Sequence, residues 1–339
     1  MARVGLVANP AAGRDIRRLT GGASVVDNYA KRRVAECVLD GLTVVDDPPA
    51  VEVMPEKAGI ASHAIDEAPS RLAVETVEMP VEESAADTRR AAAHFREWAD
   101  AVVVLGGDGT TRDVALEVGS VPLVSVSTGT NNVVPTPVDG TVAGAVAAVV
   151  ATGLADPETV TYRHGLVEAT AEDVSGEKEL TGLAAVEVTD TTFVGTRAVV
   201  DPSDLVGGVV SRAHPADIGL PGIAGCLSRV APEGPGGAAV TLGDPETADR
   251  TVRGIVAPGM TTQVGIEEHT RLDWDEPATF RVDDGVVGAD GEREVELVDA
   301  TVEIAPIPDG PRLVSPRRAL EAAGEGGALV SAAPAAEDR

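Results

Sequence analysis

The sequence predicts an α/β N-terminal domain with a largely parallel sheet, followed by a C-terminal antiparallel β domain built as a β-sandwich. Three observations lead to this prediction. Strand and helix patterns alternate through residues 1–155, and apolar residues then recur with period two over 156–310. In addition, three N-terminal strands end in loops rich in glycine or asparagine. Residues 311–339 begin with a short helical pattern and end in low-complexity sequence, which is typical of a frayed tail.

The N-terminal domain is predicted from short apolar runs that end at proline or at a polar loop, separated by helical patterns. We expect strands at 3–9, 50–55, 74–80, 101–105 and 121–127. We expect helices at 25–42, 84–100, 111–118 and 141–153. Strands that alternate with helices form a largely parallel sheet, and ligands of such sheets bind beyond the carboxyl ends of the strands.

The C-terminal domain is predicted from its period-two runs, which begin near Thr159 and are separated by glycine, proline and Asp-Gly turns. One glycine- and proline-rich stretch, 214–237, is too long for a simple connection between strands. We interpret it as a loop, with disorder as the alternative to a functional role.

The charge balance excludes several classes of partner. Asp and Glu number 55 against 27 Lys and Arg, which gives a net charge of −28. An acidic chain lacks the basic face of a nucleic-acid or membrane-surface binder, so we expect neither partner. No run is long enough to span a membrane and no signal peptide is present, so we expect a cytoplasmic protein, and we expect a homo-oligomer. Such acidity with little lysine resembles the proteins of salt-loving archaea.

The cysteines and histidines do not predict a metal site. Cys37 and Cys226 are far apart, no CxxC motif occurs, and none of the five histidines stands at ligand spacing. We therefore expect neither structural zinc nor a stabilising disulfide.

A phosphate site is predicted by "AVVVLGGDGTTRDV" at 101–114. The glycines Gly106, Gly107 and Gly109 lie between a buried strand and a helix, where backbone N–H groups point at an anion. Thr110 and Thr111 either cap the helix or bind an oxygen of the ligand. A tight strand-to-helix turn with incidental glycines is the alternative.

Asp108 stands inside this loop. Phosphates repel a carboxylate unless it holds Mg²⁺ or accepts a proton from an attacking hydroxyl. Both roles belong to phosphoryl transfer, so Asp108 is the candidate catalytic base and a candidate magnesium ligand. The alternative is a turn-forming aspartate.

Two further loops supply polar groups at the same edge of the sheet. After the first strand, "NPAAGRD" offers Asn9 and Arg14. After the strand at 121–127, "STGTNN" offers neutral donors and acceptors that suit a nucleotide. No Walker motif occurs, and no GxGxxG follows the first strand, which disfavours P-loop enzymes and dinucleotide-dependent dehydrogenases. The nucleotide-binding candidates in this group are Asn9, Thr128, Gly129, Thr130, Asn131 and Asn132.

These motifs together resemble a known superfamily. GGDGT after an apolar strand, with "NPAAG" before it and "STGTNN" after it, is similar to the superfamily shared by NAD kinases and diacylglycerol-type lipid kinases. "VSVSTGTNNVVP" and "DIGLPGIAG" resemble the ATP-NAD kinase branch typified by acetoin-catabolism protein X. The resemblance extends over about residues 3–305.

The resemblance implies use of ATP and Mg²⁺, with the nucleotide between the domains. Asp108 matches the aspartate that activates the 2′-hydroxyl of NAD in NAD kinases. Glu187 matches the glutamate of their substrate-binding Asn-Glu pair, although Val186 replaces the asparagine. Asp290 in "GADGERE" matches an Asp-Gly turn of the β domain. A hairpin turn explains this Asp-Gly pair without a functional role.

Three functions follow from these residues. The first is a kinase that phosphorylates NAD to NADP with ATP or polyphosphate. The second is a kinase of a lipid or another small alcohol; against a lipid, "VVP" follows "STGTNN" where lipid kinases have an aspartate and then an aromatic residue. The third is a nucleotide-sensing regulator without catalysis, which the intact Asp108 disfavours and Val186 allows.

Arg197, Arg212 and His214 are further candidates for phosphate contact without a supporting motif.

Overall fold

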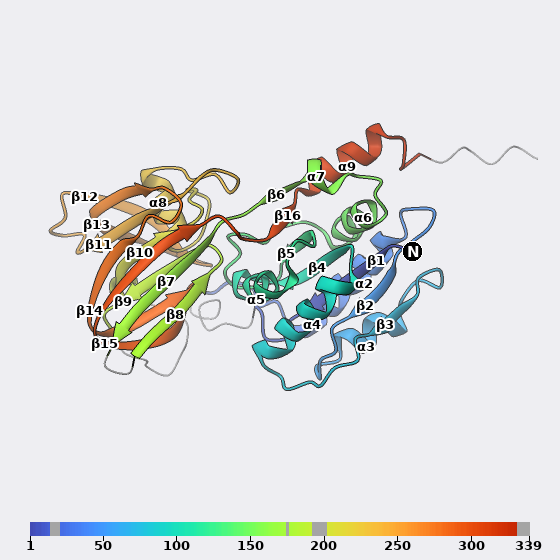
Figure 1. Ribbon diagram of the computed structural model, residues 1–339, viewed down its shortest axis with the longest axis horizontal. Coiled ribbons are helices and arrows are strands. Elements are labelled where there is room, and N and C mark those ends of the chain that lie inside the picture. The colour runs from blue at the N-terminus through green and yellow to red at the C-terminus, as the bar shows by residue number, and fades with distance from the viewer. Residues whose placement is uncertain (14–20, 174–175, 192–201, 331–339) are drawn as a thin grey trace, which may run out of the picture.

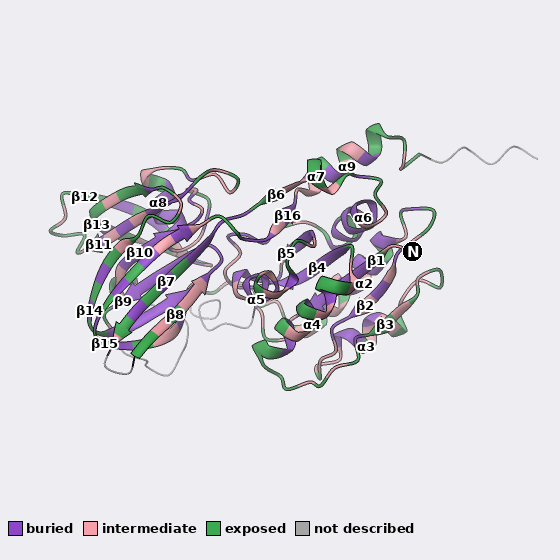
Figure 2. Cartoon of the chain, in the orientation of Figure 1, coloured by how far each residue is buried: buried purple, intermediate pink, exposed green. Residues whose placement is uncertain are grey.

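The computed structural model describes residues 1–13, 21–173, 176–191 and 202–330. The molecule has two halves, each built on one sheet, with the α/β half on the right of Figure 1 and the β half on the left. This arrangement confirms the predicted fold class. Buried residues fill the central strands β4 (Ala101–Gly106) and β9 (Ala185–Thr189), whereas exposed residues lie on the outer surfaces (Figure 2).

The α/β half contains a seven-stranded sheet in the order β3-β2-β1-β4-β5-β16-β6 among the described residues. All neighbours in it are parallel except β16 and β6. The strand order reverses between β1 and β4, which places a topological switch point at their carboxyl ends. Besides β4, the strands are β1 (Arg3–Ala8), β2 (Ala50–Val53), β3 (Val74–Thr76), β5 (Leu123–Ser127), β6 (Thr161–Arg163) and β16 (Arg312–Val314).

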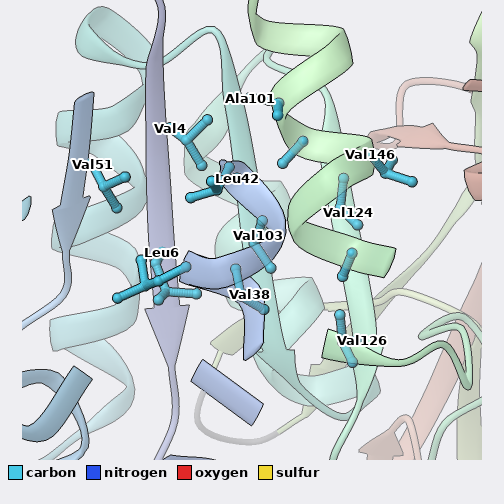
Figure 3. Packing of buried hydrophobic residues seen from close by; sticks show 14 of the residues in the cluster. Val4, Leu6, Val38, Leu42, Val51, Ala101, Val103, Val124, Val126 and Val146 are labelled. Atoms are coloured by element: carbon cyan, nitrogen blue, oxygen red, sulfur yellow. The ribbon is translucent and has the colours of Figure 1, made fainter. Parts of the chain in front are cut away.

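Helices cover both faces of this sheet because its strands are apolar on both sides. Side chains of β1, β4 and β5 pack on one face against α2 and α6, where Leu6, Val103 and Val124 meet Val38 and Val146 (Figure 3). α3, α7 and α9 contribute to the same core, and α4 and α5 cover the opposite face. The helices are α2 (Asn28–Leu42), α3 (Ile60–Asp66), α4 (Ala85–Trp98), α5 (Asp108–Val118), α6 (Gly140–Ala151), α7 (Pro157–Val160) and α9 (Pro316–Glu325).

In the β half, the described residues form a nine-stranded antiparallel sheet in the order β12-β13-β11-β10-β9-β14-β15-β7-β8. Apolar side chains from distant strands of this order share one core, and α8 (Leu220–Leu227) covers a second cluster. Besides β9, the strands are β7 (Leu166–Asp173), β8 (Gly176–Gly182), β10 (Leu205–Val210), β11 (Gly237–Gly243), β12 (Arg250–Ala257), β13 (Met260–Leu272), β14 (Ala278–Ala289) and β15 (Glu292–Ile307).

The segment expected to be a tail begins with the predicted short helix, α9, but it is packed against the α/β half. There β16 joins the sheet and α9 packs beside α6 through Ala319 and Ala323 (Figure 1). Three residues of strand are too few to be detected from periodicity. The chain therefore crosses between the halves twice, once after β6 and once before β16.

The stretch 214–237, expected to be a loop, contains the helix α8. Its Pro221 lies in the first turn, where a missing N–H is tolerated, so the proline that suggested a break is compatible with a helix start. None of the helices in the described ranges is long and apolar enough to cross a membrane.

Candidate functional site

Three loops of the α/β half meet at the carboxyl edge of its sheet. They follow β1, β4 and β5, which are neighbours in the sheet. They open into a cleft of about 1170 Å³ that also reaches residues of the β half, including Asp290. The predicted residues that line this cleft are Asn9, Gly107, Asp108, Gly109, Thr110, Gly129, Thr130 and Asn131.

The loops after β4 and β5 touch through their glycines. A Cβ added to Gly129 would lie 2.2 Å from the Cα of Gly107, and one added to Gly107 would lie 2.6 Å from the backbone oxygen of Asn131. A Cβ on Gly106 would collide with Thr110 at 2.4 Å. These three glycines are thus required by contacts within the protein. Gly109 differs, because a Cβ there would meet no atom within 4 Å.

Asparagine side chains brace the loops. Asn9 donates from Nδ2 to Oγ1 of Thr110 at 2.9 Å and accepts from the N–H of Ala11, so it joins the loops after β1 and β4. Asn132 exchanges hydrogen bonds with the backbone of Gly129 and lines neither cavity of the site. Both amides are therefore occupied by the protein itself. Thr111 also has a structural role, since its hydroxyl donates to the Gly107 carbonyl.

Other polar groups face the cleft without a partner in the described part of the chain. The hydroxyl of Thr130 and the Oδ1 of Asn131 are both buried and make no hydrogen bond there. A buried polar atom without a partner is costly, and a ligand is one way to satisfy it. Together with the start of α5 at Asp108, these atoms form the polar floor of the cleft.

Asp108 is the first residue of α5 and is 1% exposed. Its carboxylate accepts hydrogen bonds from the backbone N–H groups of Val133 at 3.0 Å and Val134 at 2.9 Å. Burial, and after it the charge of Asp290, raises the pKa of Asp108, while the two N–H groups and Arg212 lower it, and the net result is a pKa of about 7. The carboxylate is therefore a proton acceptor near neutral pH.

Asp290 lies between β14 and β15 with a left-handed backbone, φ 56°. Its carboxylate accepts from the N–H groups of Leu183, Ala184 and Ala185, at 2.8 Å for Ala184. Its carbonyl accepts from the side chain of Asn131. Asp290 is in the predicted turn and also lines both cavities, where these bonds fix the position of its carboxylate, so it is a further candidate site residue.

Arg112 connects α5 with the β half. Its guanidinium lies 3.5 Å from the Asp290 carboxylate and 3.1 Å from that of Glu294, and it is only 6% exposed. Burial acts to lower the pKa of Arg112, but Asp290, Asp113 and Glu294 outweigh it, so the pKa is raised. This buried charge spans the junction between the halves.

Glu187 is on β9 with its side chain 5% exposed, and its Oε1 accepts from the N–H of Gly291 at 3.1 Å. It lines a second, smaller cavity beneath α8, together with Asp108, Asn131 and Asp290. Val186, its neighbour on the strand, points to the opposite side and packs into the β-half core. Val186 lines neither cavity, so Glu187 is the residue of this pair that faces the site.

Some predicted residues lie outside the site. Gly106 and Thr128 line neither cavity, and Arg212 pairs instead with Asp217 at 3.1 Å. His214 accepts from the N–H of Ala216 and also lines neither cavity. Arg14 and Arg197 fall outside the described residues.

The sequence did not indicate Arg112 as a residue of the site, and it indicated only a turn role for Asp290. It also did not indicate Lys31, which supports the loop after β1 but lines neither cavity. Lys31 of α2 is fully buried, and its Nζ donates to the backbone oxygens of Asn9 and Pro10, both at 2.9 Å. The scarcity of lysine in the chain was the one sequence feature that set Lys31 apart from other residues.

The residues present fit a nucleotide better than a dedicated metal cage. The cleft is large enough for a nucleoside triphosphate, and its floor offers backbone N–H, hydroxyl and amide groups. Within the described residues, no group of three His, Cys, Asp or Glu side chains could hold a metal ion. Mg²⁺ commonly binds through one or two carboxylates and substrate phosphates, and Asp108 meets that requirement.

Comparisons with known proteins agree with this geometry. Residues 4–153 match the ATP-NAD kinase N-terminal domain, and residues 167–309 match the acetoin catabolism protein X C-terminal domain. Acetoin catabolism protein X of Cupriavidus necator is 33% identical over 309 residues, covering 86% of this chain and 84% of that protein. The crystal structure of yeast NADH kinase complexed with NADH has the same fold, with a TM-score of 0.56, 13% identity, and coverage of 99% of this chain and 90% of that one.

Proposed function

The chain belongs to the acetoin catabolism protein X family, and we propose that it is a kinase that transfers a phosphoryl group from ATP, or from polyphosphate, to the 2′-hydroxyl of NAD. One observation carries this proposal. Asp108 lies where the large cleft and the small cavity meet, so it can face a donor on one side and an acceptor on the other. The ATP-NAD kinase domain match and the fold shared with an NADH kinase support NAD as the acceptor.

In this proposal the protein positions the donor and the acceptor and supplies a catalytic base. The terminal phosphate of the donor lies over Gly109 and the start of α5, where no side chain obstructs it. The acceptor hydroxyl attacks phosphorus and gives its proton to Asp108, and ADP or the shortened polyphosphate leaves. Bound Mg²⁺, held by Asp108 and the donor phosphates, would neutralise negative charge on the donor. Metal ligation without base catalysis is the alternative role of Asp108.

The test is a turnover assay across donors and acceptors. The protein is incubated with Mg²⁺ and either ATP or polyphosphate, with NAD as acceptor, in molar KCl because the net charge is −28. NADP formation is the expected result. Nucleotide binding without NADP formation would reject NAD as the acceptor and leave the nucleotide sensor or another acceptor.

A second candidate is phosphorylation of a small alcohol other than NAD. It is favoured by the small cavity, whose described lining residues include three carboxylic acids, Asp108, Glu187 and Asp290, but no arginine or lysine for the pyrophosphate of a dinucleotide. The name of the Cupriavidus necator relative connects that protein with catabolism of acetoin, a four-carbon hydroxyketone. The same assay with small alcohols, scored by ADP release, separates the two candidates.

A further inference from the structure

The small cavity beneath α8 has an apolar wall and an acidic wall. The apolar wall comes from β10, α8 and β12, through Leu205, Leu220, Ile223 and Val256. The acidic wall consists of Asp108, Glu187 and Asp290, of which Asp108 and Asp290 also line the cleft. It includes the Oδ1 of Asn131, which has no hydrogen-bond partner among the described residues. A ligand with a carbon skeleton and hydroxyl groups would match both walls, since carboxylate and amide oxygens accept hydrogen bonds from hydroxyls.

The charge of the cavity disfavours anions. No lysine, arginine or histidine occurs among its lining residues in the described part of the chain. The guanidinium of Arg112 lines the large cleft and is shared by Asp290 and Glu294. Arg212, whose charge lowers the pKa of Asp108, is paired with Asp217 and lines neither cavity. A carboxylate or phosphate that entered would lose its hydration and meet like charges, which is a large cost.

The size of the cavity limits the ligand. Its volume of about 40 Å³ holds about three water molecules, since one water needs about 10–15 Å³ on this measure. That corresponds to a short alcohol, with any larger part of the molecule extending into the cleft past Asp108. A purine ring system is larger than this cavity.

The apolar wall is held in place by the β half. The N–H of Gly219, at the start of α8, donates to the carbonyl of Ile255 on β12 at 2.9 Å. Ile223 is fully buried against Gly254 of the same strand, where an added Cβ would lie 3.0 Å from its side chain. The cavity is therefore formed before any ligand arrives, which lowers the entropic cost of binding.

We propose that this cavity is the acceptor subsite and that it admits the hydroxyl-bearing end of an uncharged alcohol of three or four carbons, with its hydroxyls toward Asp108 and Asn131 and the rest of the molecule in the cleft. The assignment of this cavity to the acceptor rests on the proposed kinase function. For NAD, only a hydroxyl-bearing edge of ribose would enter, and the pyrophosphate would stay in the cleft. An acceptor that carries its charge beside the reacting hydroxyl is excluded.

The test measures binding without any donor, so it does not depend on turnover. The probes are 1,2-propanediol and lactate, which share a three-carbon 2-hydroxy skeleton and differ in charge. Saturation-transfer NMR should show millimolar binding of the diol and at least about tenfold weaker binding of lactate. Diol titration should shift the backbone amide signals of Ala184, Ala185 and Gly291 in the unmodified protein.

Two neighbouring substitutions on β12 locate the site. Val256→Phe fills the cavity and should abolish diol binding, whereas Ile255→Phe lies on the exposed face, 41% accessible, and should leave it unchanged. Equal binding of lactate, or equal effects of the two substitutions, would overturn the proposal. If Val256→Phe fails to fold, the amide shifts decide alone, and their absence from Ala184, Ala185 and Gly291 overturns it.

The outcomes separate this inference from the proposed function. Diol binding without phosphoryl transfer to any acceptor would reject the kinase while the subsite stands. NADP formation without diol binding would reject the subsite while the kinase stands.

Discussion

The two cavities that meet at Asp108 are built in opposite ways. The large cleft is formed by loops that directly follow three neighbouring strands, and its floor consists of backbone, hydroxyl and amide groups. The small cavity is formed by residues from β9, α8, β12 and the turn after β14, and it combines carboxyl groups with an apolar wall. The lining of the large cleft also contains carboxyl groups, among them Asp87, Asp113 and Glu294, so a donor phosphate there would need a cation such as Mg²⁺ beside it. If the proposed function holds, donor binding depends on local loops and acceptor choice on the long-range fold.

The largest effect is expected at the point that the two cavities share. Asp108→Asn removes the base but keeps an oxygen for the N–H groups of Val133 and Val134. Turnover should fall by about 10²–10⁴-fold while nucleotide binding persists, measured by kinetics and calorimetry. Asp113→Asn, a buried acid on the same helix paired with Arg89, should retain most turnover. An active Asp108→Asn variant would show that Asp108 is not the base.

The junction between the cavities is tested through Arg112. Arg112→Met leaves the buried carboxylate of Asp290 without its cation, so the free energy of unfolding should fall by about 3–5 kcal/mol in denaturant titrations. Arg281→Met is the matched control, because its ion pair with Asp299 is exposed and should change stability by less than about 1 kcal/mol. Equal losses in both variants would mean that Arg112 does not stabilise the junction.

The ionisation of Asp108 should make stability depend on pH. Folding raises the pKa of this group from 3.8 to about 7, chiefly through burial, so the folded state favours its protonated form. That contribution is fully present below about pH 4 and is lost as the pH rises to about 7.

The amide in Asp108→Asn does not ionise, so the variant does not lose stability through this group as the pH rises. The melting temperature of the variant minus that of the unmodified protein should therefore be larger at pH 8 than at pH 4. A difference in melting temperature that is the same at both pH values would contradict the raised pKa.

The smallest effects distinguish the glycines of the cleft. Gly107→Ala pushes against the loop after β5 and should lower the free energy of unfolding by about 1–3 kcal/mol. Gly109→Ala lies in open space inside α5 and should raise it by about 0.5–1 kcal/mol. If Gly109 is where the donor approaches, the same variant should bind ATP more weakly despite its higher stability. Unchanged ATP affinity would show that the donor phosphates do not bind at Gly109.

The sequence predicts the residues of the large cleft better than those of the small cavity. The run from Ala101 to Val118 predicts a strand, a glycine loop and a helix, and the structure confirms the strand and the helix; the helix begins at Asp108 rather than at Thr111, so Asp108 and Gly109 lie in its first turn instead of in a loop. Asp290 is 182 residues from Asp108, and only the pairing of β9 with β14 brings it beside Ala184 and Ala185. An Asp-Gly pair in a hairpin has a sufficient local explanation, so nothing in its neighbourhood indicates the second role.

The same limit explains α8 and β16. Proline and glycine at 221 and 222 favour a loop on local propensity, but burial of Leu220 and Ile223 stabilises a helix there. Arg312–Val314 is too short for a periodic signal and becomes a strand because it lies between β5 and β6. Tertiary contacts decided both elements.

The return of the chain through β16 makes the whole β half an insertion within the α/β half. Arg163 and Arg312, which flank that insertion, are direct partners in the antiparallel pairing of β6 and β16. A two-residue turn is a common way to join antiparallel strands at such a position. The two ends are therefore close enough for a minimal protein in which such a turn replaces residues 164–311 and the loops after β1, β4 and β5 remain on their own sheet.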